Sequence, residues 1–378
     1  MRILHLTSHV EVGGITTSVV TLAQGLIRRG HRVVVAGEGG TMADRLTREG
    51  VSVWLLPLKT SAEFSPQVCW AAWQLRRQLS LEPVDLVHAH SRVAQVIAHW
   101  LWTRHRIPYV TTWHGFYRRR WSRRWFPCTG LLTVAISEPV SRHLQEVFHL
   151  PASKIRLIPH GVDVARFDQT PEPSVIHQFR ERLRLGGDHS VIGTVTRLVH
   201  AKGVERLLQR FRDIRTRVPE AKLLIVGDGE ARRHLEGFAK RLGVAEAVRF
   251  AGSVADTRVA LSAMDLFVFV PAVQEGFGLS LLEAMASGLP IVAVKQGEGS
   301  SWVLETSGVG RVVSPDDADG FVEAVVHLLR DRAAARQLGA HARAVAKAHY
   351  DVGRMVTQTE QVYAEVVQGT PADHPRSF

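Results

Sequence analysis

Residues 265–294 read D-L-F-V-F-V-P-A-V-Q-E-G-F-G-L-S-L-L-E-A-M-A-S-G-L-P-I-V-A-V. The apolar run Leu266–Val270 is typical of a strand that is buried on both faces. Leu279–Ser287 has the spacing of a helix, and the glycine and proline that follow predict where this helix ends. Ile291–Val294 predicts the next buried strand. The stretch therefore predicts a strand, a glycine-rich loop, a helix and a second strand, which is the repeating unit of a parallel α/β sheet.

The loop of this unit has the chemistry of a ligand site. Glu275 lies at the carboxyl end of a strand, where ligands bind in open α/β sheets. Glu283 lies one helical turn after Leu279 and can point at the same crevice, although alone it would be an ordinary surface acid. The backbone N–H groups of Gly278, Leu279 and Ser280 would open the helix unpaired, so they suit phosphate or sugar oxygens. The Phe277 amide is a further candidate for contact with the sugar or phosphate.

The segment E-G-F-G-L-S-L-L-E resembles the E-x7-E signature of retaining nucleotide-sugar glycosyltransferases, in particular glycosyltransferase family 4. The match continues through L-L-E-A-M-A and G-L-P-I-V-A, so it is more specific than two acids at a fixed spacing. The resemblance implies the GT-B fold, in which two Rossmann-like domains face each other across a cleft. It also implies that Glu275 holds hydroxyl groups of the donor sugar and that Glu283 holds the ribose.

A second motif carries two cations. The segments G-T-V-T-R-L and H-A-K-G, at 193–198 and 200–203, resemble the family element G-R-L-x-x-x-K-G. Arg197 ends a predicted strand and Lys202 begins the next helix, so both suit a diphosphate at the mouth of a parallel sheet. Taken alone, they would be two surface cations of a basic protein. The resemblance implies that they stabilise the leaving nucleotide.

Other candidate residues follow predicted strands of the first half. Gly13 and Gly14 lie between the first strand and the first helix, a phosphate-binding position, although the full G-x-G-x-x-G is missing and a plain tight turn is the alternative. In the family this loop approaches the donor phosphates and the acceptor. His114, in T-W-H-G, resembles a family histidine that faces the transferred sugar, so it would bind a sugar hydroxyl or assist the acceptor. His88 and His90 have a strand-end position that faces the acceptor in relatives.

Two elements of the second half bear on the donor. The turn at 223–230, L-L-I-V-G-D-G-E, lies near the nucleotide base in the family, with Gly227 as a turn residue and Asp228 as a helix cap. The segment that follows the predicted strand Ile291–Val294 departs from the family, because Trp302 stands where relatives carry a glutamate. Glu298 or Glu305 could substitute for that glutamate, but neither has the familiar spacing. This departure leaves the identity of the donor sugar open.

The whole chain repeats the β-α rhythm, which predicts an α/β fold of two Rossmann-like domains. We expect an acceptor-side domain at 1–165, a nucleotide-sugar domain at 166–350, a helix at 351–368 that crosses back to the first domain, and a flexible tail at 369–378. The helix predicted at 65–78 carries Trp70 and Trp73, which we expect to pack against the sheet. Strands are expected at 3–7, 32–36, 53–56, 85–88, 109–112, 131–135, 155–158, 191–195, 222–226, 248–251, 266–270, 291–294 and 311–313.

Composition and charge limit the classes of partner that this protein could bind. The 378 residues are 45% hydrophobic and 22% charged, as in a folded globular protein, and the net charge is +11. Arg118–Phe126 interleaves arginine with aromatic residues, which suits an anionic membrane surface, while a solvated basic loop is the alternative. No nucleic-acid motif accompanies the charge. Two cysteines, a start that enters a strand directly and no long apolar run predict a cytoplasmic protein, in part peripheral at the inner face of the membrane.

The leading hypothesis is a retaining glycosyltransferase that moves a sugar from a nucleotide-diphosphate sugar to a glycan or lipid-linked acceptor in envelope polysaccharide or lipopolysaccharide synthesis. No cofactor and no metal are expected, because the sequence has neither a Cys/His spacing typical of zinc nor an Asp-x-Asp at the donor site. The alternatives are an epimerase or phosphorylase of the same fold and a non-catalytic nucleotide-sugar-binding module.

Overall fold

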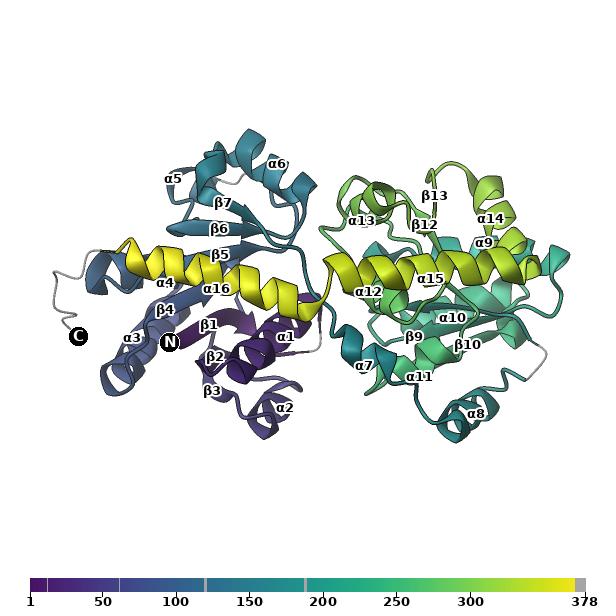
Figure 1. The fold of residues 1–378 in the computed structure, drawn as a ribbon, viewed down its shortest axis with the longest axis horizontal. Coiled ribbons are helices and arrows are strands. Elements are labelled where there is room, and N and C mark those ends of the chain that lie inside the picture. Colours follow the sequence, from purple (N-terminus) through teal and green to yellow (C-terminus); the bar gives the residue numbers. More distant parts are fainter. Residues whose placement is uncertain (12, 61, 119–120, 187–188, 371–378) are drawn as a thin grey trace. The chain divides into compact units, whose positions relative to one another are not determined.

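The computed structural model describes the chain except residues 12, 61, 119–120, 187–188 and 371–378. It contains two compact units, formed by residues 1–161 with 352–378 and by residues 162–351 (Figure 1). Each unit is built on a parallel sheet with helices around it. The expectation of two Rossmann-like α/β units is therefore confirmed. Among the described residues, no helix combines the length and apolar character that a membrane crossing needs.

The first unit holds a seven-stranded sheet in the order β3-β2-β1-β4-β5-β6-β7. Serine hydroxyls at Ser65, Ser91 and Ser137 cap three of its helices by accepting from the backbone N–H three residues on. The elements are β1 (Arg2–His9), α1 (Gly14–Arg28), β2 (Arg32–Glu38), α2 (Ala43–Arg48), β3 (Ser52–Leu55), α3 (Pro66–Leu81), β4 (Leu86–Ala89), α4 (Arg92–His105), β5 (Tyr109–Trp113), α5 (Trp121–Trp125), β6 (Leu132–Ala135), α6 (Glu138–Phe148), β7 (Ile155–Leu157) and α16 (Val352–Gln368).

The second unit holds a six-stranded sheet in the order β10-β9-β8-β11-β12-β13. Its main core lies between this sheet and α9, α10 and α14. The elements are α7 (Val164–Asp168), α8 (Pro173–Arg182), β8 (Val191–Val195), α9 (Val204–Arg217), β9 (Lys222–Val226), α10 (Arg232–Arg241), β10 (Val248–Gly252), α11 (Thr257–Ser262), β11 (Leu266–Phe269), α12 (Leu279–Ala286), β12 (Ile291–Val294), α13 (Gly299–Ser307), β13 (Arg311–Val313), α14 (Ala318–Arg330) and α15 (Arg332–His349).

Each sheet has one topological switch point. The chain adds strands outward from β1 in one direction and then returns to place β4 on the other side of β1. In the second sheet the same reversal brings β11 beside β8. At such a point the loops after the two neighbouring strands diverge and leave a crevice beyond their carboxyl ends, where ligands of open α/β sheets bind. The two places to look for function are therefore the carboxyl ends of β1 and β4 and those of β8 and β11.

Helix α3 buries a different face from the one expected. Trp70 and Trp73 do not pack against the sheet: their side chains stack on each other, and their exposed fractions are 53% and 42%. The buried stripe of α3 is instead Val68, Ala71, Leu75 and Leu79, whose spacing of three and four residues defines the opposite face.

The expected helix cap at Asp228 is not formed. Helix α10 begins at Arg232, and the Asp228 carboxylate instead accepts from the Gly229 N–H and pairs with the Arg232 guanidinium. Arg119 and Arg120 of the arginine-aromatic run lie outside the described residues.

Helix α16 belongs to the core of the first unit. Met355, Val356 and Tyr363 of α16 are buried in one cluster with residues of α1 and β1. Gly25 of α1 faces Val356 so closely that a Cβ atom at residue 25 would lie 2.3 Å from the Val356 Cγ2. This glycine therefore allows the two helices to approach closely, at the expense of helix propensity in α1.

We predict that Gly25→Ala lowers the free energy of unfolding by about 1–3 kcal/mol, because overpacking against Val356 exceeds the gain in helix propensity. The matched control is Gly237→Ala in α10, where a Cβ would meet only the flexible tip of Arg241, at 3.6 Å. This control should raise the free energy of unfolding by up to about 1 kcal/mol. Urea unfolding measures both values, and equal stabilisation by the two substitutions would contradict the close packing of α1 on α16.

Candidate functional site

The turn after β8 is held against the end of β11 by backbone contacts. The Ala272 N–H donates to the Ala201 carbonyl oxygen at 2.9 Å. Gly203 has a φ of 68°, and a Cβ there would lie 2.0 Å from the Val270 carbonyl oxygen. Only glycine allows this approach in this backbone conformation. The K-G pair of the sequence motif thus brings Lys202, the residue before Gly203, to the switch point of the second sheet.

Lys202 and Glu275 meet at this switch point. The Lys202 Nζ lies 2.5 Å from the Glu275 Oε1, and the exposed fractions of the two side chains are 25% and 15%. The pair is therefore partly withdrawn from water, where its attraction is stronger than that of a surface pair and where the loss of one partner leaves a charge that is poorly compensated. The two residues come from different motifs, 73 positions apart, and the structure joins them directly.

Arg197 lies nearby in sequence but is placed differently. It follows β8 and is exposed, and the structure records no ion pair for its guanidinium among the described residues. The turn after β9 approaches this segment through Gly227, which has a φ of 126°; a Cβ there would lie 1.9 Å from the Thr196 carbonyl oxygen. Gly227 is thus required by the contact between two strand ends, in addition to any contact with a nucleotide.

The glycine-rich loop leads into α12 as the sequence predicts. Gly278 precedes the helix with a φ of 105°, and Leu279 and Ser280 form its first turn without a side-chain cap. The Phe277 ring is buried and packs edge-on against Tyr350, with the ring centroids 5.9 Å apart. The buried Phe277 side chain anchors the loop, so Phe277 can contact a ligand only through its backbone. The backbone N–H groups at the start of α12 are the groups of this segment whose chemistry suits an anion.

Glu283 has a different environment from Glu275. Its carboxyl group hydrogen-bonds Thr257 of α11, and Arg166 and Asp256 lie near it. Burial raises its pKa to about 7, against the opposing effects of Thr257 and Arg166. No contact with Lys202 or Glu275 is recorded, so the E-x7-E motif places its two acids in separate surroundings. Thr257 was not identified from the sequence, because nothing in the spacing of the motif indicates α11.

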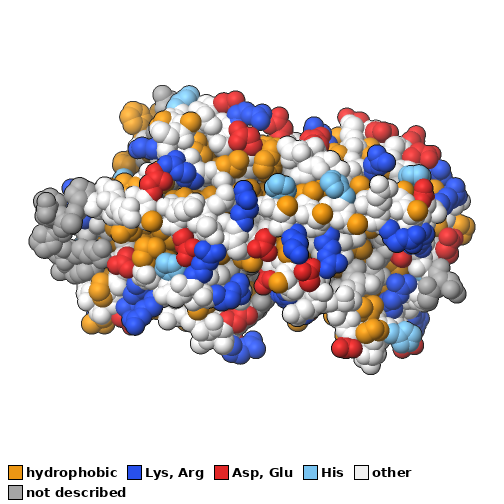
Figure 2. Space-filling view, viewed as in Figure 1, with side chains coloured by type: hydrophobic (Ala, Val, Ile, Leu, Met, Phe, Trp, Pro, Cys, Tyr) orange, Lys and Arg blue, Asp and Glu red, His pale blue; other side chains and the backbone are white. Residues whose placement is uncertain are grey.

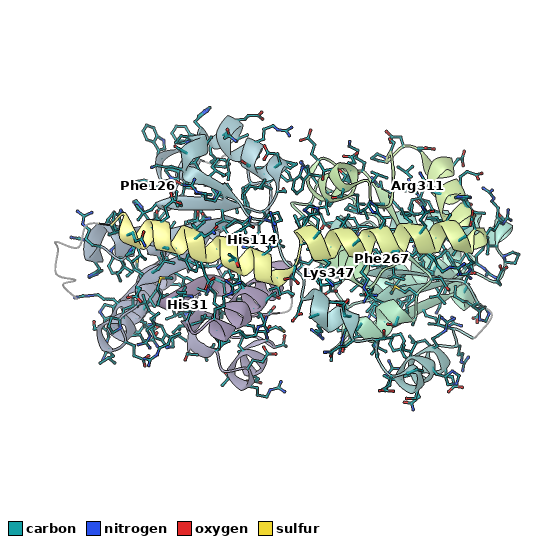
Figure 3. The ribbon with its side chains drawn as sticks, in the orientation of Figure 1. His31, His114, Phe126, Phe267, Arg311 and Lys347 are labelled. Carbon is teal, nitrogen blue, oxygen red and sulfur yellow. The ribbon has the colours of Figure 1, made fainter. Side chains whose placement is uncertain are left out.

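In the first unit, His114 (labelled in Figure 3) follows β5 and stands in a row of hydrogen-bonded imidazoles. Its Nε2 lies 3.2 Å from the His90 Nδ1, and its Nδ1 lies 3.4 Å from the His160 Nε2. The row continues from His90 Nε2 to His5 Nδ1 at 2.9 Å, and from His160 Nδ1 to the Ser18 hydroxyl at 2.8 Å. His5 was missed from the sequence, although a histidine within the fully buried stretch of β1 is itself a signal.

His88 stands beside this row rather than in it. Its Nδ1 lies 2.6 Å from the Tyr363 hydroxyl and its Nε2 lies 2.7 Å from the Thr112 hydroxyl. The nitrogens of His5, His88 and His90 lie within 4.8 Å of one another, so within the described residues these three rings are close enough to hold a metal ion. Burial lowers the pKa of His5 to about 3 and holds the pKa of His88 and of His90 well below the usual value.

Gly13 and Gly14 stand at the start of α1, the helix that follows β1. A Cβ at either glycine would meet no atom within 4 Å. Packing within the protein therefore does not explain why these residues are glycines. Their place beyond β1, next to β4 at the switch point, is the position where backbone approaches a ligand in this class of fold.

A cavity of about 550 Å³ lies elsewhere in the second unit, lined by residues of α9, Gln296 and the segment before α14. Arg210, on its wall, donates to the Pro315 carbonyl oxygen at 2.9 Å and stacks over Phe321. These contacts give Arg210 a structural role. The cavity lies apart from the residues predicted from the motifs, so we do not identify it with the site.

Comparisons with known proteins agree with the two-unit architecture. The first half matches the family described as Glycosyltransferase Family 4 over residues 12–166, and the second half matches Glycosyl transferases group 1 over residues 175–345. An uncharacterized glycosyltransferase from Methanocaldococcus jannaschii is 28% identical over 344 residues, covering 85% of this chain and 86% of that protein. A GDP-mannose-dependent phosphatidylinositol monomannoside mannosyltransferase of Mycolicibacterium smegmatis is 37% identical over 201 residues, about half of each chain.

Among solved structures, Anabaena Alr3699/HepE in complex with UDP-glucose superposes with a TM-score of 0.83, covering 97% of this chain and all of that one at 22% identity. At this identity the likeness supports the fold alone. The two family matches follow one another along the chain and leave out residues 1–11, 167–174 and 346–378. The chain therefore belongs to the glycosyltransferases that these two family models describe, and it has the GT-B fold.

Proposed function

We propose that this protein transfers a sugar, with retention of anomeric configuration and without a metal ion, from a nucleotide-diphosphate sugar to a glycan or lipid-linked acceptor of the cell envelope. The observation that carries the proposal is the ion pair between Lys202 and Glu275 at the switch point of the second sheet. This pair brings together a cation suited to a diphosphate and a carboxylate that can accept hydrogen bonds from sugar hydroxyls. The mannosyltransferase relative, whose name specifies a sugar nucleotide and a lipid, supports the substrate class.

The pair leaves both side chains able to bind a donor. An ammonium group has three N–H donors, so Lys202 can hold Glu275 with one and a phosphate oxygen with the others. The Glu275 carboxylate accepts from Lys202 through Oε1, which leaves Oε2 for hydroxyl groups of the sugar. We infer that the pair fixes the distance between the sugar and the diphosphate. Arg197 would add bidentate contacts to the diphosphate, and the N–H groups at Phe277–Ser280 would bind the remaining oxygens.

The proposed reaction needs no nucleophile from the protein. The acceptor oxygen would form its bond to the anomeric carbon on the face from which the phosphate leaves, and the leaving phosphate oxygen would take the proton of the acceptor hydroxyl. Negative charge grows on the diphosphate as the bond to the sugar breaks. Lys202 and Arg197 would stabilise that charge more in the transition state than in the ground state, which is how they would lower the barrier.

We predict that Lys202→Met and Glu275→Gln each lower kcat for transfer by about 10²–10³, the range found for the loss of one preorganised electrostatic contact. The double variant should lose less than the product of the two, because each single change already breaks the pair. Arg217→Met and Glu323→Gln are the matched controls, since these residues form a cation–carboxylate pair of the same length, at 2.5 Å, that is more exposed.

The measurement is release of nucleoside diphosphate with a panel of sugar nucleotides and acceptors, together with thermal shifts for donor binding. Full activity of both single variants would contradict the proposed site. Donor binding by the wild type with no turnover on any glycan or lipid acceptor would contradict the proposed reaction while leaving the donor site in place.

Glu283 gives the donor site a pH dependence. If its carboxylate accepts hydrogen bonds from the ribose, the ionised form is the binding form, and its pKa of about 7 makes that form scarcer as the pH falls. We predict that affinity for a nucleotide-diphosphate sugar weakens from about pH 8 to about pH 6, and that Glu283→Gln removes this dependence. Calorimetric titration with UDP-glucose measures it, because a diphosphate diester does not titrate in this range. An unchanged pH profile in the variant would contradict a role for Glu283 in binding.

We further propose that the aromatic residues of α5, together with Phe126 directly after it, contact an anionic membrane surface. The exposed fractions of Trp121, Trp125 and Phe126 are 77%, 66% and 54%. The segment is anchored from within: the Arg92 guanidinium donates to the Phe126 carbonyl oxygen at 2.7 Å, and Phe126 packs edge-on against the exposed Phe64. Exposed rings on a fixed support, within a stretch rich in arginine, have the composition of an interfacial contact (Phe126 is labelled in Figure 3).

Surface charge favours this partner over nucleic acid. Figure 2 shows basic and acidic side chains interspersed on the face in view, rather than a continuous basic field of the kind that tracks a nucleic-acid backbone. The net charge of +11 would then act through a local contact and through general attraction to anionic lipid.

We predict that Trp121→Ser/Trp125→Ser weakens sedimentation with phosphatidylglycerol vesicles by about tenfold or more, because two large rings no longer enter the interface. The control is Trp70→Ser/Trp73→Ser, which also removes two exposed tryptophans from the same unit. An equal loss in both variants, or no binding by the wild type, would contradict the proposed surface. Transfer to a water-soluble acceptor analogue should be unchanged in both.

A further inference from the structure

The first unit contains a row of four imidazoles that the proposed reaction does not fully use. It runs from His5 through His90 and His114 to His160, and it ends at the Ser18 hydroxyl. Each ring uses one nitrogen toward each neighbour. His5, His90 and His160 are almost completely buried, with exposed fractions of 0%, 2% and 6%. His5 lies within β1, whereas His90, His114 and His160 follow the carboxyl ends of β4, β5 and β7.

The hydrogen bonds in this row must all point the same way. A neutral imidazole has one N–H donor and one lone pair, so a ring that accepts on one side must donate on the other. Burial, together with neighbouring histidines, keeps His90 and His114 neutral by lowering the pKa of each well below its usual value. The four rings therefore share one tautomer, either all protonated on Nδ1 or all protonated on Nε2.

The buried end of the row decides between the two directions. The Nε2 of His5 is buried and has no hydrogen-bond partner among the described residues. If the rings carried Nε2–H, this end would hold an unpaired N–H donor; if they carry Nδ1–H, it holds only an unused lone pair. Buried N–H groups without an acceptor are rarer and costlier than acceptors that lack a donor. The other end tolerates either direction, because the Ser18 hydroxyl both donates and accepts.

We propose that His5 sets the Nδ1–H tautomer of His114 through His90, so that His114 donates a hydrogen bond to a substrate hydroxyl oxygen and does not act as a general base. The assignment of a substrate contact to His114 rests on the proposed function; the tautomer does not. To accept a proton, His114 would have to place an Nε2–H against the Nδ1–H of His90. The link from His114 to His160 is the longest of the row, at 3.4 Å, so a hydroxyl oxygen would replace this bond at the lowest cost.

Three buried histidines near β1 and β4, namely His5, His88 and His90, suggest a metal site as the alternative explanation for the positions of these rings. A metal at His5, His88 and His90 would need free lone pairs on all three rings. Both nitrogens of His88 already contact hydroxyl groups, those of Tyr363 and Thr112. The hydrogen-bond row accounts for the positions of His5 and His90 without a metal, and the two explanations differ in an observable that does not depend on activity.

The first test is the tautomer itself, read in the full chain without donor or acceptor. Long-range ¹⁵N–¹H correlation spectra of protein labelled at its 19 histidines distinguish protonated from unprotonated ring nitrogens. Substitutions at His5, His90, His114 and His160 assign the signals. We expect all four rings in the Nδ1–H form, which free histidine in water disfavours. An Nε2–H form at His114, or one equivalent of zinc retained by the purified protein with a shift of the His5, His88 and His90 signals, would overturn the proposal.

The second test separates a donor from a base. His114→Asn keeps an N–H donor near the position of Nδ1 but cannot take a proton at neutral pH. We expect it to retain transfer within about tenfold of the wild type, whereas His114→Leu falls by about 10² or more in kcat. Equal loss in both variants would overturn the donor role. If no donor is turned over by the wild type, the proposed function fails while the tautomer result stands.

The third test addresses positioning by His5. His5→Phe removes the end of the row, so the remaining rings no longer have a preferred direction. We expect mixed tautomers at His114 and a lower kcat with an unchanged KM for the donor, which binds to the other unit. His105→Phe is the control, since His105 is buried on α4 and is not part of the row. An unmixed His114 signal in folded His5→Phe would overturn the role of His5, and the wild-type spectrum decides the direction of the row even if this variant does not fold.

Discussion

The contact on which the proposed donor site depends is the close approach of the turn after β8 to the end of β11. Gly203 lets the backbone pass the Val270 carbonyl oxygen at a distance that any side chain would prevent, and the Ala201–Ala272 hydrogen bond fixes the same contact. Because two loops diverge at a switch point, they would not otherwise hold their side chains together. The ion pair of Lys202 and Glu275 is the result: a partly buried pair whose position is set by backbone geometry and not by two flexible surface loops.

Much of this could be predicted from the sequence, because strands of a parallel sheet read as apolar runs and the loops between them carry glycine. The order of elements and the motif residues follow from that pattern. The contact between Lys202 and Glu275 does not, since sequence separation says nothing of which strands become neighbours. Trp70 and Trp73 show the same limit: a helix can have two stripes with apolar spacing, and only the tertiary structure selects the one that is buried. His5 was not identified from the sequence, because a polar residue within an apolar run is taken as part of that run.

The two switch points use different physical means to fix a functional group. In the second unit the means is charge, where removing one partner leaves the other without compensation in a partly dry site. In the first unit the groups are neutral, and geometry acts through the direction of hydrogen bonds. Burial has opposite consequences for the acids and bases involved: it raises the pKa of Glu283 toward neutrality, and it lowers the pKa of the histidines far enough to remove their charge.

The substrates proposed for the two units make different chemical demands. A sugar nucleotide carries its charge on the diphosphate, so the unit that binds it needs fixed cations and a carboxylate that cannot drift. An acceptor hydroxyl is neutral and must be oriented rather than attracted, and a neutral N–H donor orients it without competing for its proton. If the leaving phosphate takes that proton, a strong base beside the hydroxyl would be of no use. A row of imidazoles held neutral, with one end closed by His5, supplies a directional donor that a lone surface histidine, free to change tautomer and charge, would not.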